Sequence, residues 1–193
     1  MTRTKTAPRR PDRSRRQRII DATLTVIADF GVEGLTHRRV AVTAGVPASA
    51  PSYYFDSIED LLQAALVEVV ALEMQAFRRR LSGLESVSQL PELLAAYVVE
   101  GVRQDPAKIV VFGELHVAAL RRTGLREVVN EWDSMWLDLL APMIGARAAL
   151  TTTLLSGELS QRALRSSDNL DAAEVEEIFR SACGLPQNHV DHT

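Results

Sequence analysis

The sequence predicts an all-α fold, and three observations support this prediction. Apolar residues recur at three- and four-residue steps over most of the 193-residue chain, as on the buried side of a helix. Aromatic residues make up only 5% of the chain, which is typical of domains built from packed Ala- and Leu-rich helices. No internal repeat and no parallel-strand pattern occurs in the sequence, so helices alone must build the core.

The first expected helix spans residues 13–30. Ile20, Leu24 and Ile27 lie at four- and three-residue steps on one face of it, and Gly31 ends it. A second helix follows Thr36, whose hydroxyl can accept a backbone N–H of the first turn. It stops at Gly45, where a left-handed residue is expected.

A short third helix is expected from about Ala50 to Tyr54. With Ser49 as its N-cap, Pro51 falls in the first turn, where a proline is tolerated. We expect an extended segment, residues 46–48, to lead into this helix. A longer fourth helix begins after Ser57, with an acidic residue at its third position, and runs to about residue 81.

Five further helices are expected in the remainder of the chain. Proline or glycine opens three of them, at Pro91, Pro106 and Gly124. Residues 147–165 and 171–183 carry the last two helical patterns. Residues 1–12 and 186–193 are expected to be disordered tails.

The second and third helices, joined at Gly45, have the pattern of a helix-turn-helix. Ala41 is small enough for a second helix to cross close by, and Val46 is placed to fill the angle between the two helices. Val40, Val46 and Phe55 are expected in the core. In such a motif the second helix enters the major groove of DNA.

The same stretch, with its flanks, resembles the N-terminal domain of the TetR (tetracycline-repressor) family of bacterial transcription regulators. The resemblance covers residues 15–62, about a quarter of the chain. It rests on Ile19-Ile20, Gly31, Thr36, Arg39-Val40-Ala41, Ala44-Gly45-Val46, Tyr53-Tyr54-Phe55 and Asp60-Leu61-Leu62. Three positions depart from the family pattern: Pro47-Ala48 replaces a frequent Ser-Lys, Ser52 replaces a frequent Tyr, and Ile58 replaces a usual Lys.

The distribution of charge agrees with a DNA-binding head. The whole chain carries a formal charge of −3. Residues 1–55 contain ten Lys and Arg against four acidic residues, whereas residues 56–193 contain twelve against twenty-one. A basic head on an acidic body is the pattern of a DNA-binding module attached to a part that does not bind DNA. We therefore divide the chain into a basic arm (1–12), a helix-turn-helix domain (13–62), a helical ligand-binding and dimerisation domain (63–185) and a tail (186–193).

The predicted DNA contacts follow from residue chemistry. Arginines suit phosphate contacts, while hydroxyl groups and tyrosines can read bases where the recognition helix lacks charge. The predicted residues are Arg15, Arg16, Arg38, Arg39, Thr43, Ser49, Ser52, Tyr53 and Tyr54. By resemblance, Tyr54 hydrogen-bonds the DNA backbone, and a palindromic operator requires a homodimer.

The resemblance also implies a small-molecule effector within the body. Apolar and aromatic side chains with few polar groups are what such a site needs. The predicted ligand-binding residues are Phe112, His116, Trp132, Met135 and Trp136. Glu114 and His116 point in different directions, so only one of them is expected beside the tryptophans. By resemblance, the last two helices form the dimer interface, with close approach at the small residues Thr151, Thr152, Thr153, Ser156 and Gly157.

Other classes of function find little support. The sequence contains no Glu-x-x-His, His-Glu-x-x-His, Gly-x-Ser-x-Gly or phosphate-binding glycine loop, so neither an enzyme nor a cofactor or metal site is expected. His189 and His192 carry only a weak metal signal. One cysteine, no apolar leader and no uncharged run of 18 residues indicate a cytoplasmic chain outside the membrane.

The favoured hypothesis is a ligand-responsive, homodimeric regulator, most simply a repressor of a double-stranded DNA operator. Two alternatives stay open: a helix-turn-helix protein whose body binds other proteins, and an all-α enzyme or storage bundle. A fully packed body without a cavity would argue against a small ligand.

Overall fold

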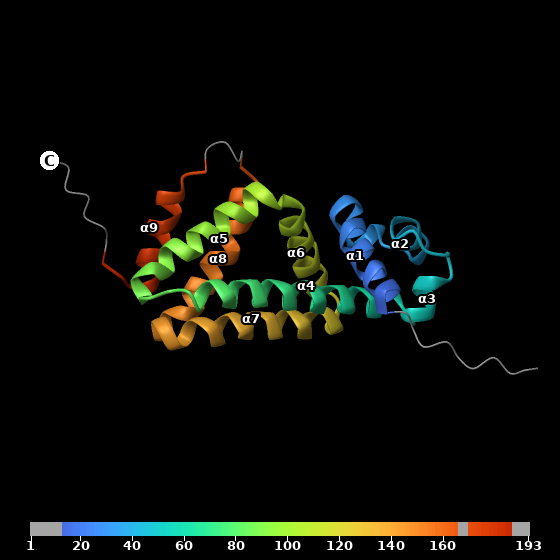
Figure 1. The fold of residues 1–193 in the computed structure, drawn as a ribbon, viewed down its shortest axis with the longest axis horizontal. Helices are drawn as coiled ribbons and strands as arrows, with labels where there is room; N and C mark the ends of the chain where they lie inside the picture. The colour runs from blue at the N-terminus through green and yellow to red at the C-terminus, as the bar shows by residue number, and fades with distance from the viewer. Residues whose placement is uncertain (1–12, 166–169, 187–193) are drawn as a thin grey trace, which may run out of the picture. The chain divides into compact units, whose positions relative to one another are not determined.

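The computed structural model describes residues 13–165 and 170–186, and within these ranges the chain is helical and without strands (Figure 1). The all-α prediction is confirmed. The basic arm, most of the tail, and His189 and His192 lie outside the described residues. The α-helices are α1 (Arg13–Phe30), α2 (His37–Thr43), α3 (Ala50–Tyr54), α4 (Ile58–Leu81), α5 (Leu90–Gln104), α6 (Pro106–Ala119), α7 (Thr123–Ile144), α8 (Ala148–Ala163) and α9 (Ala172–Cys183).

The chain forms two compact units, residues 1–65 and 66–193. Helix α4 begins in the first unit and ends in the second. In the first unit, α1, α2 and α3 pack on one another around fully buried side chains that include Ile19, Ile20 and Val40. This burial of aliphatic side chains supplies the main stabilisation of the unit.

In the second unit, α5, α8 and α9 pack together, and α6 packs on α5, α7 and α8. Figure 1 shows α7 running alongside the second half of α4. Phe77 of α4 and Trp136 of α7 touch there, with 4.5 Å between their ring centroids. The core of this unit includes Met74, Leu94, Leu115 and Phe179, all fully buried.

Side-chain caps fix the starts of several helices. Thr36 accepts the backbone N–H of Arg39 at 3.2 Å, and Ser57 accepts that of Asp60 at 3.0 Å. Both caps were predicted, and each satisfies an N–H that has no partner within its own helix. Gly45 has a φ of 61°, which confirms the left-handed turn expected after α2.

Two local predictions in the turn between α2 and α3 are wrong, and a third is confirmed in position only. Residues 46–48 do not form an extended lead-in, because Ala50 N–H bonds to the carbonyl of Pro47 at 2.8 Å and closes a turn. Ser49 is the N-cap residue of α3 and Pro51 lies in the first turn, as predicted, although the Ser49 side chain makes no capping hydrogen bond. Val46 is only half-buried rather than a core residue.

The interface predicted on α8 also needs correction. Thr151 and Thr152 are buried inside the protomer, where the Thr152 hydroxyl donates to the carbonyl of Ala148 at 2.9 Å. They therefore pack in the core. Thr153, Ser156 and Gly157 are exposed and remain available to a partner.

Candidate functional site

The helix-turn-helix carries the predicted DNA contacts at its surface. Eight of the nine predicted residues are exposed, and the ninth, Tyr54, is half-buried. The exposed apolar side chains of the motif are Val42, 76% exposed, and Tyr53, 65% exposed. Large apolar groups at such exposure suit contact with base edges and methyl groups.

Two of the predicted arginines also make contacts within the protein. The Arg16 guanidinium lies over the ring of Phe55, with 5.2 Å between its central carbon and the ring centroid. Arg39 lies over Phe30 at 4.5 Å and donates from Nη1 to the carbonyl of Gly34. These cation–π contacts connect α1 to the segments that follow it. A phosphate contact from either residue stays a prediction.

Ser52 connects the two helices of the motif. Its hydroxyl lies 2.9 Å from Nδ1 of His37, at the start of α2. Because α3 contains five residues, such a contact helps to fix its direction relative to α2. The sequence suggested only a base contact for Ser52, because no local sequence pattern relates Ser52 to His37, which lies 15 positions away.

Tyr53 and Tyr54 form an edge-to-face pair with 5.3 Å between their ring centroids. This geometry is favourable between aromatic rings and restricts the positions that the two hydroxyl groups can reach. The short helix thus presents its tyrosines as a pair rather than as two independent side chains.

The body contains an apolar cavity of about 300 Å³ among α5, α6, α7 and α8. Four of the five predicted ligand-binding residues line it: Phe112, His116, Trp132 and Trp136. Met135 is half-buried but does not line the cavity, nor does Glu114. The remaining lining residues, which the sequence did not indicate, are Tyr97, Ile109, Gly113, Val117, Leu155, Ser156, Leu159 and Ser160.

An aromatic stack forms one wall of this cavity. Phe112 stacks on Trp132 with 4.4 Å between centroids, and the His116 ring tilts against Trp132 at 5.1 Å. His116 Nδ1 lies 2.9 Å from the carbonyl of Phe112. Because a carbonyl only accepts, Nδ1 carries the hydrogen in this contact.

The cavity wall also contains a polar group that lacks a partner. The indole Nε1 of Trp132 is buried, and none of the described residues accepts a hydrogen bond from it. Leaving a buried donor unpaired costs about 1–3 kcal/mol.

A second opening of about 380 Å³ adjoins the first, because His116 and Ser156 line both. Its other walls include Asp133, Thr152 and Thr153. Burial raises the pKa of the Asp133 carboxyl, and nearby His116 opposes this shift. Leu137 and Ala149 line it as well, so its walls are mixed polar and apolar.

Aromatic contacts connect the cavity to α4. Tyr97 and Trp136 line the cavity, and both contact Phe77. The ring centroids are 5.6 Å apart for Phe77 and Tyr97, 4.5 Å for Phe77 and Trp136, and 5.6 Å for Tyr97 and Trp136. Phe77 lies on α4 and is almost fully buried. Close-packed rings transmit displacement because they leave no free space to absorb it.

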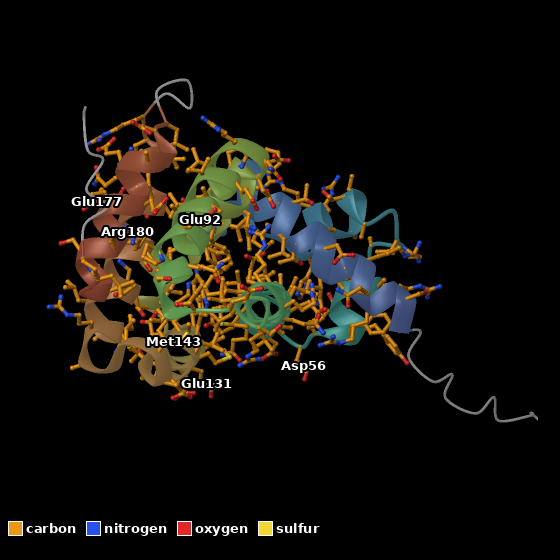
Figure 2. The ribbon with its side chains drawn as sticks, turned by 60° about the vertical axis from the view of Figure 1, so that its left-hand side comes forward. Asp56, Glu92, Glu131, Met143, Glu177 and Arg180 are labelled. Carbon is orange, nitrogen blue, oxygen red and sulfur yellow. The ribbon has the colours of Figure 1, made fainter. Side chains whose placement is uncertain are left out.

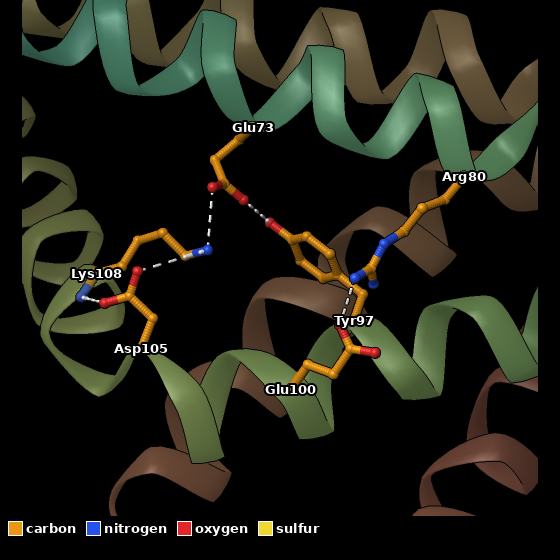
Figure 3. A network of polar contacts seen from close by, with 6 residues as sticks. All are labelled: Glu73, Arg80, Tyr97, Glu100, Asp105 and Lys108. Atoms are coloured by element: carbon orange, nitrogen blue, oxygen red, sulfur yellow. Dashed lines mark hydrogen bonds and ion pairs between the residues drawn. The ribbon is translucent and has the colours of Figure 1, made fainter.

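A polar network lies beside Tyr97 (Figure 3). The Tyr97 hydroxyl donates to Glu73 of α4 at 3.1 Å, and Lys108 Nζ of α6 donates to the other Glu73 oxygen at 3.0 Å. Burial, together with the charge of Glu73 and the hydrogen bond to it, raises the pKa of Tyr97 far above its ordinary value. No pattern in the sequence predicts this network, because Tyr97 and Lys108 lie 24 and 35 positions from Glu73.

Within 13–165 and 170–186, no group of three or more His, Cys, Asp or Glu residues could hold a metal ion. One stretch, residues 123–163, is long and apolar enough to cross a membrane by length and composition. It contains α7 and α8, which Gly145 separates at a φ of 57°. The stretch is thus two packed helices with a turn between them.

A protein-family comparison agrees with this arrangement. The family described as "Bacterial regulatory proteins, tetR family" matches residues 19–65, which span α1 to the start of α4. Among curated proteins, the HTH-type transcriptional regulator BetI of Cronobacter sakazakii is 35% identical over 107 residues, or 55% of this chain. The chain spans about half the length of this relative, 48%.

Solved structures match nearly the whole chain. The multidrug binding protein EbrR, in complex with imidazole, is 33% identical with a TM-score of 0.74, over 92% of this chain and 99% of EbrR. A TetR-family member from Streptomyces coelicolor A3 is 32% identical with a TM-score of 0.74, over 90% and 99% of the two chains. Other structures of EbrR contain ethidium, proflavin or malachite green.

Proposed function

Because this chain belongs to the TetR family of bacterial transcriptional regulators, we propose that it is a homodimeric repressor released from a palindromic operator by a small effector. Like its relatives, it is a helix-turn-helix regulator and not an enzyme. The proposal adds the dimer, the operator and the effector to that assignment. We also propose a cytoplasmic location, which is typical of the family.

The observation that carries the effector proposal is the apolar cavity and its connection to α4. A cavity of about 300 Å³ with aromatic walls and few polar groups suits a small apolar or amphipathic molecule. Phe77 connects its wall to α4, the helix that begins in the first unit. The ligands of EbrR support an aromatic effector of this kind.

The proposed mechanism is a shift between two states of the dimer. An effector that binds one position of α4 more tightly than the other displaces the equilibrium toward that position. A coupling of about 1–3 kcal/mol would change operator affinity some 5- to 150-fold. The rival proposal, a body that binds only proteins, gains no support from an internal cavity.

DNA contact is proposed for the exposed surface of the motif. Arg15, Arg16 and Arg38 would bind phosphates, and Tyr53 with Val42 would face the bases. Thr43, Ser49 and Tyr54 remain proposed contacts as well. Arg39 and Ser52 also remain proposed, although both already have partners within the protein.

The dimer is proposed to form through α8 and α9. An open groove between these helices contains the exposed Leu150 together with Leu154 and Ile178. Arg180 and Glu177 lie on α9 (Figure 2), and Arg180 is buried inside the protomer, where it pairs with Glu176 and Glu177. A second copy could cover the apolar side chains of the groove.

Fluorescence anisotropy on a labelled duplex from the region upstream of the protein's own gene tests the function. We expect salt-dependent binding of one dimer, which an effector that fits the cavity weakens. A monomer in solution at micromolar concentration, or binding unaffected by any cavity ligand, would contradict the proposal.

A further inference from the structure

Glu73 lies in the wall of a polar cavity of about 360 Å³ in the body, which differs from both openings described above. Its carboxylate side chain is only 15% exposed and receives one hydrogen bond on each oxygen, from Tyr97 and from Lys108 (Figure 3). Buried carboxylates are retained only with such partners, because desolvation of an unpaired charge is costly. This cavity is distinct from the apolar one described above.

The charges around this cavity favour a cation. Three carboxylates line it, Glu73, Glu100 and Asp105, against the two cations Arg80 and Lys108. Arg80 pairs with Glu100, so Lys108 serves both of the other acids. The lining therefore carries one more negative than positive formal charge.

The position of Lys108 allows an exchange of partners. Its Nζ lies 3.0 Å from Glu73 and 4.0 Å from the Asp105 carboxylate, which is half-exposed. An incoming ammonium group can take the place of Lys108 at Glu73, and Lys108 can then move to Asp105. Every charge keeps a partner in this exchange.

An anion would have the opposite effect. A carboxylate that captured Lys108 would leave Glu73 with Tyr97 alone, and removing one member of a buried pair is strongly destabilising. The same arrangement that accepts an amine thus rejects an acid of the same shape.

The polar and apolar cavities are neighbours. The Tyr97 side chain lines both of them. Gly101 lines the polar cavity, and a Cβ atom at this position would lie 3.2 Å from Leu159 Cδ2 and 4.0 Å from Ile109 Cδ1. Both of those side chains line the apolar cavity, so the wall between the two is thin.

We propose that the polar cavity is the subsite for a positively charged amine of the effector, with Glu73 as its direct partner and Asp105 as the acceptor of the displaced Lys108. The apolar part of the same molecule would occupy the cavity beside Trp132. This inference rests on the proposed effector binding and specifies its chemical class as an amphipathic amine. Since Glu73 lies on α4, the exchange would act directly on that helix.

Isothermal titration of the full-length protein with three probes that share a phenylbutyl skeleton tests this: 4-phenylbutylamine, 4-phenylbutanol and 4-phenylbutanoic acid. At neutral pH we expect the amine to bind at least about tenfold more tightly than either other probe, a difference of roughly 1.4 kcal/mol. Glu73→Gln should abolish the preference. Glu92→Gln, an exposed position on α5 (Figure 2), should keep it.

Asp105 is the N-cap of α6, where its side chain accepts the backbone N–H of Lys108 at 3.1 Å. Asp105→Asn therefore provides a second variant that should fold normally, because asparagine also caps helices well. It removes the charge that receives Lys108 and leaves Glu73 in place, so it should also weaken amine binding. Equal binding of the three probes by the wild type, or a preference that survives both substitutions, would overturn the amine subsite and leave the apolar effector site standing. Failure of all three probes to bind would overturn both.

Discussion

The guanidinium of Arg39 lies over the ring of Phe30, with 4.5 Å between its central carbon and the ring centroid. The same group donates to the carbonyl of Gly34, and so connects α2 to the end of α1. Arg38, its neighbour, is exposed at the first turn of α2. Two adjacent arginines thus differ in their contacts within the protein, so substitutions at the two positions can distinguish a role in folding from the proposed role in DNA binding.

Arg38→Ala should weaken operator binding with little change in stability, because it removes the proposed phosphate contact at an exposed position. Arg39→Ala should lower the free energy of unfolding by about 1–2 kcal/mol, from loss of the cation–π contact and hydrogen bond. Urea unfolding and anisotropy titrations on both variants measure the two effects. Loss of DNA affinity in folded Arg39→Ala that equals the loss in Arg38→Ala would show that both arginines bind phosphate.

Removal of residues 1–12 should reduce the salt dependence of DNA binding. The segment carries four basic residues, Arg3, Lys5, Arg9 and Arg10. If all four contact phosphates, the slope of log affinity against log salt should fall in magnitude by up to about four for each arm. Titrations at several salt concentrations measure the slope. An unchanged slope would mean that the arm does not touch DNA.

The sequence predicted most of the fold because each helix has local signals. The ends of α1, α3 and α4 agree with the expected ends, since Gly31, Pro51 and Ser57 act on the backbone beside them. Contacts between distant residues were not predictable in this way. The Ser52–His37 contact, the Glu73 network and the inward position of Thr151 depend on how helices cross, and no spacing in the chain encodes the crossing.

The same limit applies to the cavity. Phe112, Trp132 and Trp136 were predicted because they are large aromatic residues, and His116 because it could contact a ligand. Gly113 and Ser156 instead line the cavity because their side chains are small and leave space. A small residue in a helix can allow packing or leave space, and only the surrounding helices decide which. Met135, predicted from its place beside Trp136, lies outside because adjacent helical positions differ by about 100° in direction.

Gly113 offers a position from which a larger side chain can fill the cavity. It lines the cavity within α6, and a Cβ atom there would meet no atom within 4 Å. Gly113→Phe should abolish the response to an effector while operator binding persists, because the ring occupies the ligand volume. Gly113→Ala is the matched control, and it should keep the response and raise stability by up to about 1 kcal/mol, since alanine favours helices. A normal effector response in Gly113→Phe would place the ligand elsewhere.

A charge at Leu150 should separate the dimer. This side chain is 51% exposed on α8, beside the groove that includes Leu154 and Ile178. Leu150→Glu would place a charge in an apolar interface, so sedimentation should show a larger monomer fraction and operator affinity should fall with it. Leu164→Glu, at a side chain 83% exposed near the end of α8, serves as the comparison. A dimer of unchanged strength in Leu150→Glu would exclude this groove from the interface.

Ionisation of Tyr97 in the unfolded chain should lower the free energy of unfolding at alkaline pH. Burial, followed by the charge of Glu73 and the hydrogen bond to it, raises the pKa of Tyr97 above its ordinary value of 10.0. In the unfolded chain the phenol loses its proton near pH 10, whereas the folded protein retains it. The contribution of Tyr97 is therefore fully present below about pH 10 and is lost as the pH rises further, by up to about 1.4 kcal/mol per pH unit.

Tyr97→Phe isolates this contribution from the other groups that titrate in alkali. The variant should be less stable at pH 8 by about 1 kcal/mol, because Glu73 loses one hydrogen bond. The gap between variant and wild type should then narrow above pH 10, since phenylalanine has no proton to lose. Urea unfolding of both proteins at pH 8 and 10.5 measures this change, with Tyr53→Phe as the control at a side chain 65% exposed. A difference in the free energy of unfolding that stays constant across this range would mean that Tyr97 ionises as readily in the folded protein as in the unfolded chain. The hydrogen bond to Glu73 would then not keep the Tyr97 hydroxyl protonated.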